Sequence, residues 1–321
     1  MLIFWILFTL FIVAMLALDL GVLHRGSNAM GFKQALWGCA FWITLAIAFG
    51  VLVLVWLGHQ KALEFTTGYL IEESLSVDNL FVFLVLFRFF KVPHEYQYNV
   101  LFWGIVGALI MRFVFIVVGV GAIQRFHWII YVFGAILIYS GIKLAFGEEI
   151  EVEPEKNFVL KSFRRFVPIS PDYAGKKFFV RDGARRVATP LLAVLIVVET
   201  TDLLFAVDSI PAVLAITRDP FIVFTSNVFA ILGLRAMYFA LSGMFGIFHY
   251  LHYGLSAILI FVGAKMLLSN ENVSAFGIPL HTDIPTPIVL TVVGSILALS
   301  VIASLAFPDK KRRRHGEPAG A

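Results

Sequence analysis

Cysteine and charge are both scarce in this sequence. A single cysteine, Cys39, cannot form a disulfide within the chain, so a disulfide-stapled extracellular fold is excluded. Only 14% of the 321 residues are charged, which argues against a large solvated domain. The eight histidines fall at the ends of apolar runs, in loops or in the tail, so a zinc or copper site inside the apolar runs is not expected.

Apolar residues are abundant instead, at 60% of the chain with a mean hydropathy of +0.90. A bilayer core of about 30 Å is crossed by a helix of roughly 20 apolar residues. Nine runs of that kind are present, at 2–23, 34–57, 68–87, 98–120, 128–146, 190–216, 220–245, 250–268 and 286–307. We therefore predict an all-α, polytopic membrane bundle of about nine transmembrane helices in one domain, 1–309, with a basic cytosolic tail at 310–321.

Lysine and arginine indicate the orientation, because they concentrate on the cytosolic side of membrane proteins. With the N-terminus outside, 18 of the 25 basic residues lie in inner segments, three in outer loops and four within the runs. We expect the cell inner (plasma) membrane, an external N-terminus and a cytosolic C-terminus. No positive charge precedes the first run, so it predicts an uncleaved helix, not a signal peptide. The tail 310-KKRRR-314 then faces anionic membrane lipid, and no nucleic-acid partner is expected.

Two blocks of the chain resemble each other in three successive places. The matching pairs are 72-EESLSVDNLF-81 with 202-DLLFAVDSIP-211, 107-GALIMRF-113 with 230-AILGLRA-236, and 135-AILIYSGIK-143 with 257-AILIFVGAK-265. The predicted orientation places the two blocks in opposite directions across the membrane. Inverted repeats of this kind are typical of secondary transporters, whose substrate sites lie at the repeat interface.

The repeat divides the predicted domain into parts. They are repeat A at 68–146, a cytosolic linker at 147–189, repeat B at 190–268 and a ninth helix at 286–307. Within the linker, 178-FFVRDGARRV-187 predicts a β-hairpin around Asp-Gly. The linker is either a regulatory or partner-binding element or a plain connection enriched in positive charge by the topology.

Seven acids lie inside the apolar runs, although an ionisable residue at a helix centre costs about 2.5–3.5 kcal/mol on insertion scales. They are Asp19, Glu72, Glu73, Asp78, Glu199, Asp202 and Asp208, against the four cations Arg112, Lys143, Arg235 and Lys265. The remaining negative charge requires protons or a bound cation. Asp19 is either interfacial or buried, Glu73 is expected to face solvent or headgroups, and both lysines are expected to extend to the headgroups.

Oxygen ligands from these runs would suit a hard divalent cation: Mg²⁺, Ca²⁺ or Mn²⁺. The candidate ligands are Glu72, Asp78, Asn79, Glu199, Asp202, Asp208 and Ser209, with Arg112 and Arg235 as counter-charges. Residues six apart on a regular helix point about 120° apart, so Glu72 and Asp78 cannot share one ion unless the helix breaks. Pro211 predicts such a break in the sixth run and frees the carbonyl of Val207. The arginines could instead form purely structural ion pairs.

Four stretches resemble one known family. The stretches 68-GYLIEESLSVDNLFVF-83, 178-FFVR-181, 189–239 and 257-AILIFVGAKML-267 are similar to the TerC family of integral membrane proteins, named for tellurium resistance. The resemblance implies manganese export or the metalation of secreted proteins. It also places the family's acidic motifs on the seven candidate ligands.

The leading expectation is thus an inner-membrane Mn²⁺ efflux transporter, exchanging the metal for protons, with Mn²⁺ as cargo and no tightly bound cofactor. The alternative is a non-transporting scaffold linked to tellurium or stress resistance and protein export, with membrane-protein partners unknown. An intramembrane enzyme is not expected, because the runs hold no Ser–His pairing and no histidine-rich metal site.

The orientation leads to a labelling prediction. Because the basic linker is placed in the cytosol, cysteines introduced by Asn157→Cys or Lys176→Cys should resist a membrane-impermeant thiol reagent in intact cells and react after the cells are opened. Labelling from outside would overturn both the orientation and the inversion of the repeat.

Overall fold

The structure, a computed structural model, describes residues 2–21, 31–126, 128–146, 158–182, 185–242, 250–268, 274–275, 278–279 and 284–306. Its elements are α1 (Leu2–Gly21), α2 (Phe32–Leu57), α3 (His59–Phe89), α4 (His94–Arg125), α5 (Ile129–Phe146), α6 (Phe158–Phe166), β1 (Phe179–Asp182), β2 (Arg185–Ala188), α7 (Pro190–Leu214), α8 (Pro220–Ser242), α9 (Leu251–Leu268), β3 (Ser274–Ala275), β4 (Ile278–Pro279) and α10 (Thr286–Ala306). Among the described residues strands occur only as two small antiparallel pairs, so the predicted all-α bundle is confirmed.

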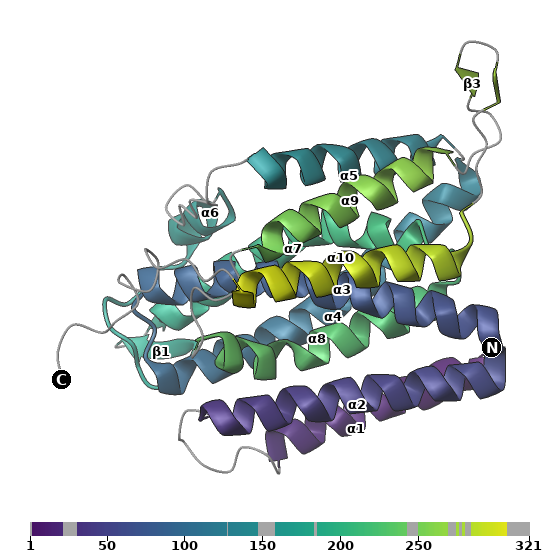
Figure 1. The fold of residues 1–321 in the computed structure, drawn as a ribbon. Coiled ribbons are helices and arrows are strands. Elements are labelled where there is room, and N and C mark those ends of the chain that lie inside the picture. The colour runs from purple at the N-terminus through teal and green to yellow at the C-terminus, as the bar shows by residue number, and fades with distance from the viewer. Residues whose placement is uncertain are drawn as a thin grey trace.

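Seven described helices are long and apolar enough to cross a membrane. They are α2, α4, α5, α7, α8, α9 and α10. Two further long helices lie beside them in the same bundle (Figure 1): α1, whose apolar part is shorter, and α3, which carries several charges along its length. The chain is therefore a multi-pass integral membrane protein.

The helices form layers, with α5 and α9 at one side of the bundle and α1 and α2 at the other (Figure 1). Between them lie α3, α4, α7 and α8. Nearly every residue of α8 is buried, so this helix is the centre of the bundle as described. Polar side chains on the buried faces of these four helices are shielded from lipid.

The inner helices of the two blocks run in opposite directions. Gly68, in the first third of α3, lies against Val213 at the end of α7, so that a Cβ at Gly68 would be 3.1 Å from the valine side chain. Tyr98, at the start of α4, accepts a hydrogen bond from Arg235 in the second half of α8. Thus α3 is antiparallel to α7 and α4 is antiparallel to α8.

The α5–α9 pair is also antiparallel and brings two backbones into contact. A Cβ on Gly141 of α5 would lie 2.9 Å from the carbonyl oxygen of Ser256, and one on Gly263 of α9 would lie 2.9 Å from the carbonyl oxygen of Gly134. Gly263 follows Gly141 by 122 residues, and Ser256 follows Gly134 by the same 122. The two contacts are therefore reciprocal, as small residues at a membrane helix interface allow.

The predicted hairpin in the linker is confirmed. Strands β1 and β2 pair antiparallel, with Val180 opposite Val187; the turn residues 183–184 lie outside the described residues. Two hydrogen bonds hold the linker to the bundle, Tyr173 Oη to the Phe90 carbonyl at 2.7 Å and Asn99 Nδ2 to the Lys176 carbonyl at 2.8 Å. Burial raises the pKa of Tyr173 to about 12, which keeps its hydroxyl protonated as a donor.

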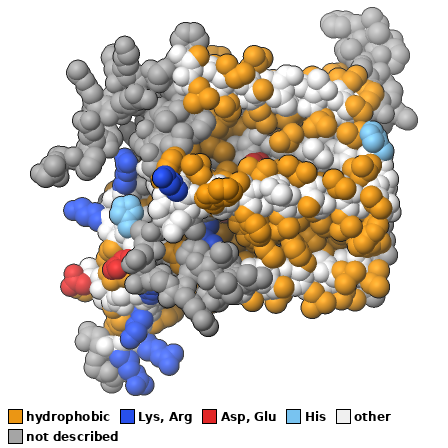
Figure 2. Space-filling model, turned by 60° about the horizontal axis from the view of Figure 1, so that its bottom comes forward, with side chains coloured by type: hydrophobic (Ala, Val, Ile, Leu, Met, Phe, Trp, Pro, Cys, Tyr) orange, Lys and Arg blue, Asp and Glu red, His pale blue; other side chains and the backbone are white. Residues whose placement is uncertain are grey.

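The surface separates apolar from charged side chains. Figure 2 shows hydrophobic side chains over most of the visible face, while Lys and Arg side chains gather at the end of the molecule that carries β1. A charged end next to an apolar body is typical of an integral membrane protein.

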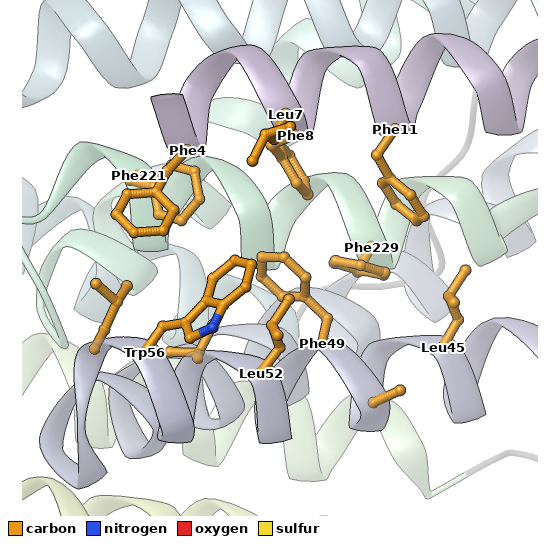
Figure 3. A pocket seen from close by; sticks show the side chains of 13 residues that line it. Phe4, Leu7, Phe8, Phe11, Leu45, Phe49, Leu52, Trp56, Phe221 and Phe229 are labelled. Carbon is orange, nitrogen blue, oxygen red and sulfur yellow. The ribbon is translucent and has the colours of Figure 1, made fainter. Parts of the chain in front are cut away.

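A cavity of about 340 Å³ lies between α1, α2 and α8 (Figure 3). Its lining is apolar throughout apart from the indole nitrogen of Trp56, and includes rings from all three helices, such as Phe8, Phe49 and Phe229. Aromatic side chains contact one another around it; the Phe8 and Phe229 ring centroids are 6.1 Å apart. This cavity offers no ligand for an ion.

The α5–α9 contact predicts a large effect for a small change. Gly263→Ala should lower the midpoint of thermal unfolding of the detergent-purified protein, because its Cβ must displace the facing backbone, at a cost of about 1–3 kcal/mol. Gly294→Ala on α10 is the matched control: nothing lies within 4 Å of its Cβ, so stability should stay level or rise. Equal unfolding midpoints for Gly263→Ala and the wild type would contradict backbone contact between α5 and α9.

Candidate functional site

Charged and amide side chains meet where the four inner helices come together. Glu72 comes from α3, Arg112 from α4, Asp202 from α7 and Asn227 from α8. Their exposed fractions are 0%, 1%, 3% and 0%, so the group is closed off from solvent and lipid. We call these four residues the central cluster.

Arg112 joins the two acids of the central cluster. Its Nη1 donates to a carboxylate oxygen of Glu72 and, at 2.5 Å, to Asn227 Oδ1. Its Nη2 lies 3.5 Å from Asp202 Oδ1. Asn227 Nδ2 in turn donates to the other Glu72 oxygen at 2.9 Å. The guanidinium therefore lies between a carboxylate of α3 and a carboxylate of α7.

Several polar atoms of the central cluster have no hydrogen-bond partner among the described residues. These are Nε and Nη2 of Arg112 and Oδ2 of Asp202. Losing one partner of a buried ion pair typically costs about 3–5 kcal/mol, because the other charge is left uncompensated. Each charge of the cluster therefore depends on its partners. Within the described part of the chain, however, only one nitrogen of the guanidinium is hydrogen-bonded.

Glu199 lies one helical turn before Asp202 on α7 and extends the acidic surface. Its carboxylate lies directly on Gly107 of α4, where a Cβ would overlap it. Glycine at this position leaves room for the carboxylate between the helices. With Glu72, three carboxylates thus line the region where α4 meets α3 and α7, and Arg112 is the basic residue that ion-pairs there.

The remaining candidate ligands lie in other surroundings. Asp208 is partly buried and accepts a hydrogen bond from Ser140 of α5 at 2.6 Å. Asn79 and Ser209, which match each other in the repeat, are buried, and Asn79 Nδ2 and Ser209 Oγ have no hydrogen-bond partner in the described part of the chain. Asp78 is partly buried on α3.

The predicted break at Pro211 is wrong. Helix α7 runs through it to Leu214, and Pro211 is buried. Proline removes one backbone hydrogen bond here, in the last turn of the helix. Packing on the neighbouring helices offsets that loss. A free Val207 carbonyl therefore does not supply an ion ligand through a broken helix.

Arg235, the repeat counterpart of Arg112, has different surroundings. Its Nη1 donates to Tyr98 Oη at 2.9 Å, and the guanidinium carbon lies 4.6 Å from the centroid of the Tyr98 ring. This combination of hydrogen bond and cation–π contact anchors the α4–α8 pair.

Two expectations about side-chain direction are wrong. Glu73 does not face solvent or headgroups: its Oε2 is buried, and its Oε1 would lie 3.9 Å from a Cβ at Gly233 of α8. Lys265 does not extend to the headgroups but donates from Nζ to the Ala215 carbonyl at 2.8 Å, just after the end of α7. Helix C-termini leave carbonyls unbonded, and a lysine satisfies one of them. Lys143 is exposed, and the side chain of Asp19 lies outside the described ones.

A second polar group, which sequence reasoning missed, ties helix ends together. Lys61 Nζ lies 2.8 Å from Glu64 Oε2 and 3.2 Å from Asp219 Oδ2, and Thr217 Oγ1 donates to Glu64 Oε2 at 2.6 Å. It connects the start of α3 to the α7–α8 turn. Asn227 was missed as well, although it is the lone amide in the run 220–245, and a buried amide needs partners.

The candidate ligands do not converge on one point. Among the described residues, no group of three or more His, Cys, Asp or Glu side chains is close enough to hold a metal ion. The central cluster, with Glu199 beside it, is the place where buried carboxylates of both blocks come nearest to a shared partner. Its oxygen atoms are the donor type that hard divalent cations use.

The sequence has clear relatives. Residues 57–313 match the family described as Integral membrane protein TerC family. The membrane protein STKORF319 of Myxococcus xanthus is 48% identical over 301 residues, covering 94% of this chain and 91% of its own length. A protein of Escherichia coli K12 named putative membrane-bound redox modulator Alx is 42% identical over 307 residues, covering 93% and 92%. No solved structure matches. On the family match and these identities, the chain belongs to the TerC family of integral membrane proteins.

Proposed function

We propose that this protein is a divalent metal transporter of the cell inner membrane, with Mn²⁺ exported from the cytosol as its substrate. The observation that carries the proposal is the charge of the inner helices. Glu72, Glu199 and Asp202 are opposed by Arg112 alone among the described ion pairs of this region. Intramembrane acids are costly, so an excess of them points to a cation pathway.

The chemistry of the donors supports a hard cation. Carboxylate, amide and hydroxyl oxygens suit Mn²⁺, Mg²⁺ and Ca²⁺, and they suit copper or zinc poorly. Manganese is selected from this set through the resemblance to the TerC family, whose members are implicated in manganese export. Exchange against protons is part of the proposal, because carboxylates released by the metal can accept them.

An inverted repeat of three helices is the architecture we infer. The antiparallel pairs α3–α7, α4–α8 and α5–α9 support it, as do the reciprocal glycine contacts between α5 and α9. The central cluster takes one acid from each block, Glu72 and Asp202, at matching positions of the repeat. A substrate site at a repeat interface is what such transporters use.

We further propose nine membrane spans, with α1 and α3 crossing beside the seven apolar helices. The N-terminus is then outside and the end that carries β1 is cytosolic. The gathering of Lys and Arg side chains at that end supports this orientation (Figure 2).

The name of the Alx relatives suggests a redox role as a second possibility. A single cysteine in the whole chain excludes an intrachain dithiol–disulfide couple, so such a role would have to be indirect, for instance through the supply of metal to other proteins.

Transport can be tested with the purified protein alone. Proteoliposomes that contain only this chain should accumulate Mn²⁺ down a gradient. Asp78→Asn and Asp208→Asn each remove one acid of the proposed cation pathway, outside the central cluster, while keeping its shape, and should reduce flux by roughly tenfold or more, since interactions with charged groups contribute about 1.5–3 kcal/mol. Glu95→Gln, an exposed acid at the start of α4, is the control and should transport normally.

Two results would contradict this proposal. Wild-type proteoliposomes without divalent flux would favour the non-transporting scaffold. Normal flux by both aspartate variants, with normal membrane insertion, would leave these acids as structural groups. Insertion itself should be preserved, because removing an intramembrane charge lowers the cost of insertion.

A further inference from the structure

We propose that Arg112 is a resident cation that the transported metal displaces. Its guanidinium bridges Glu72 and Asp202, and a divalent ion can use both carboxylates only after the guanidinium has moved away. This inference rests on the proposed transport function and assigns to one residue the control of affinity and release.

The positions of the three side chains support displacement. Divalent cations bind carboxylate oxygens at about 2.0–2.6 Å. Nη1 of Arg112 is hydrogen-bonded to Glu72, and Nη2 is 3.5 Å from Asp202 Oδ1. While the guanidinium occupies this space, the carboxylates of α3 and α7 cannot both reach one ion. Metal and guanidinium therefore compete for the same oxygen atoms.

Only one nitrogen of the Arg112 guanidinium is held by hydrogen bonds, which makes it feasible for the guanidinium to leave the two carboxylates. A planar guanidinium pairs best with a carboxylate through two parallel bonds. Here the bonds to Glu72 and Asn227 both start from Nη1, while Nε and Nη2 have no hydrogen-bond partner among the described residues. Asp202 is buried and its Oδ2 likewise has no partner there, so the site keeps an oxygen available to an incoming cation.

A second acid lies where the displaced arginine could pair. Glu199 lies on Gly107, which is on the same helix as Arg112 and nearer to the N-terminus of α4. Residues three apart share one face of a helix, so Glu199 and Asp202 lie on the same side of α7, and a guanidinium that leaves Asp202 has a second acid of that face to approach. The arginine could then leave Glu72 and Asp202 without becoming an isolated buried charge.

If the metal displaces Arg112, removing this residue should have opposite effects on metal affinity and on the rate of transport. Removing a competing cation should tighten metal binding, because the acids are free to coordinate. It should also slow release, because nothing replaces the departing ion between the carboxylates. A purely structural arginine would instead weaken binding when it is removed, through disorder of the acids it holds.

The test measures Mn²⁺ affinity and flux for the full chain in lipid nanodiscs and proteoliposomes. Free Mn²⁺ is followed by its paramagnetic resonance signal. Arg112→Gln should bind Mn²⁺ at least tenfold more tightly than the wild type and transport it at least tenfold more slowly. Arg112→Lys, whose point charge cannot contact both acids at once, should bind more tightly than the wild type but less tightly than Arg112→Gln. Arg125→Gln removes the same charge from the exposed end of the same helix and should leave the affinity unchanged.

Free guanidinium supplies an independent readout. In Arg112→Ala the missing group leaves a space of its own shape, so guanidinium ions at millimolar concentration should compete with Mn²⁺ and partly restore flux. The same ions should change neither quantity in Arg125→Gln.

The outcomes separate this inference from the proposed function. If the wild type transports Mn²⁺ but folded Arg112→Gln binds it no more tightly, displacement is wrong and transport stands. If Arg112→Gln fails to accumulate, Arg112→Lys takes its place: tighter binding than the wild type supports displacement, and equal or weaker binding overturns it. If the wild type neither binds nor moves a divalent ion, the proposed function falls and this inference falls with it.

Discussion

The contact of Arg112 with Glu72 and Asp202 is the constraint around which the inner helices are arranged. Charges at this depth are tolerated only when they face one another inside the bundle. The contact requires α3, α4 and α7 to meet at one level, and Asn227 adds α8 to the same point. A buried ion pair is a weak source of net stability, but a misplaced partner is heavily penalised. The cluster therefore specifies the arrangement of these helices more than it strengthens it.

The rest of the bundle isolates this point from lipid and water. The α5–α9 pair closes one side through backbone contact at Gly141 and Gly263, and α2 covers part of α8 on the other. At the helix ends, Lys265 bonded to the Ala215 carbonyl holds α9 at the end of α7, and Thr217 bonded to Glu64 holds the start of α3 near the same end. Low polarity around the cluster strengthens every charge interaction within it.

Much of this arrangement could be predicted from the sequence, because the length of an apolar run and an Asp-Gly turn are strong signals. The helical class, the spans of the apolar helices and the β1–β2 hairpin follow from run length and from Asp-Gly. Side-chain direction could not be predicted. Glu73 and Lys265 lie in apolar runs where the sequence alone does not distinguish a lipid-facing side from a buried one, and both point inward. The partnership of Asn227 with Arg112 depends on helices far apart in the chain, and no local pattern reports it. Pro211 stays helical because its tertiary surroundings outweigh its preference to break a helix.

The aromatic contacts that hold α1 beside α8 have a consequence for the order in which the bundle assembles. The rings of Phe8, Phe49 and Phe229 meet at centroid distances of 4.9 to 6.1 Å and leave an apolar space among them (Figure 3). During synthesis the apolar helix α2 enters the bilayer long before α8 exists, so its rings, such as Phe49, first rest against acyl chains. These ring contacts involve no hydrogen bond, so α8 can replace lipid beside them without breaking one. The side of the bundle formed by α1 and α2 is then made early, and its packing is completed only when α8 arrives.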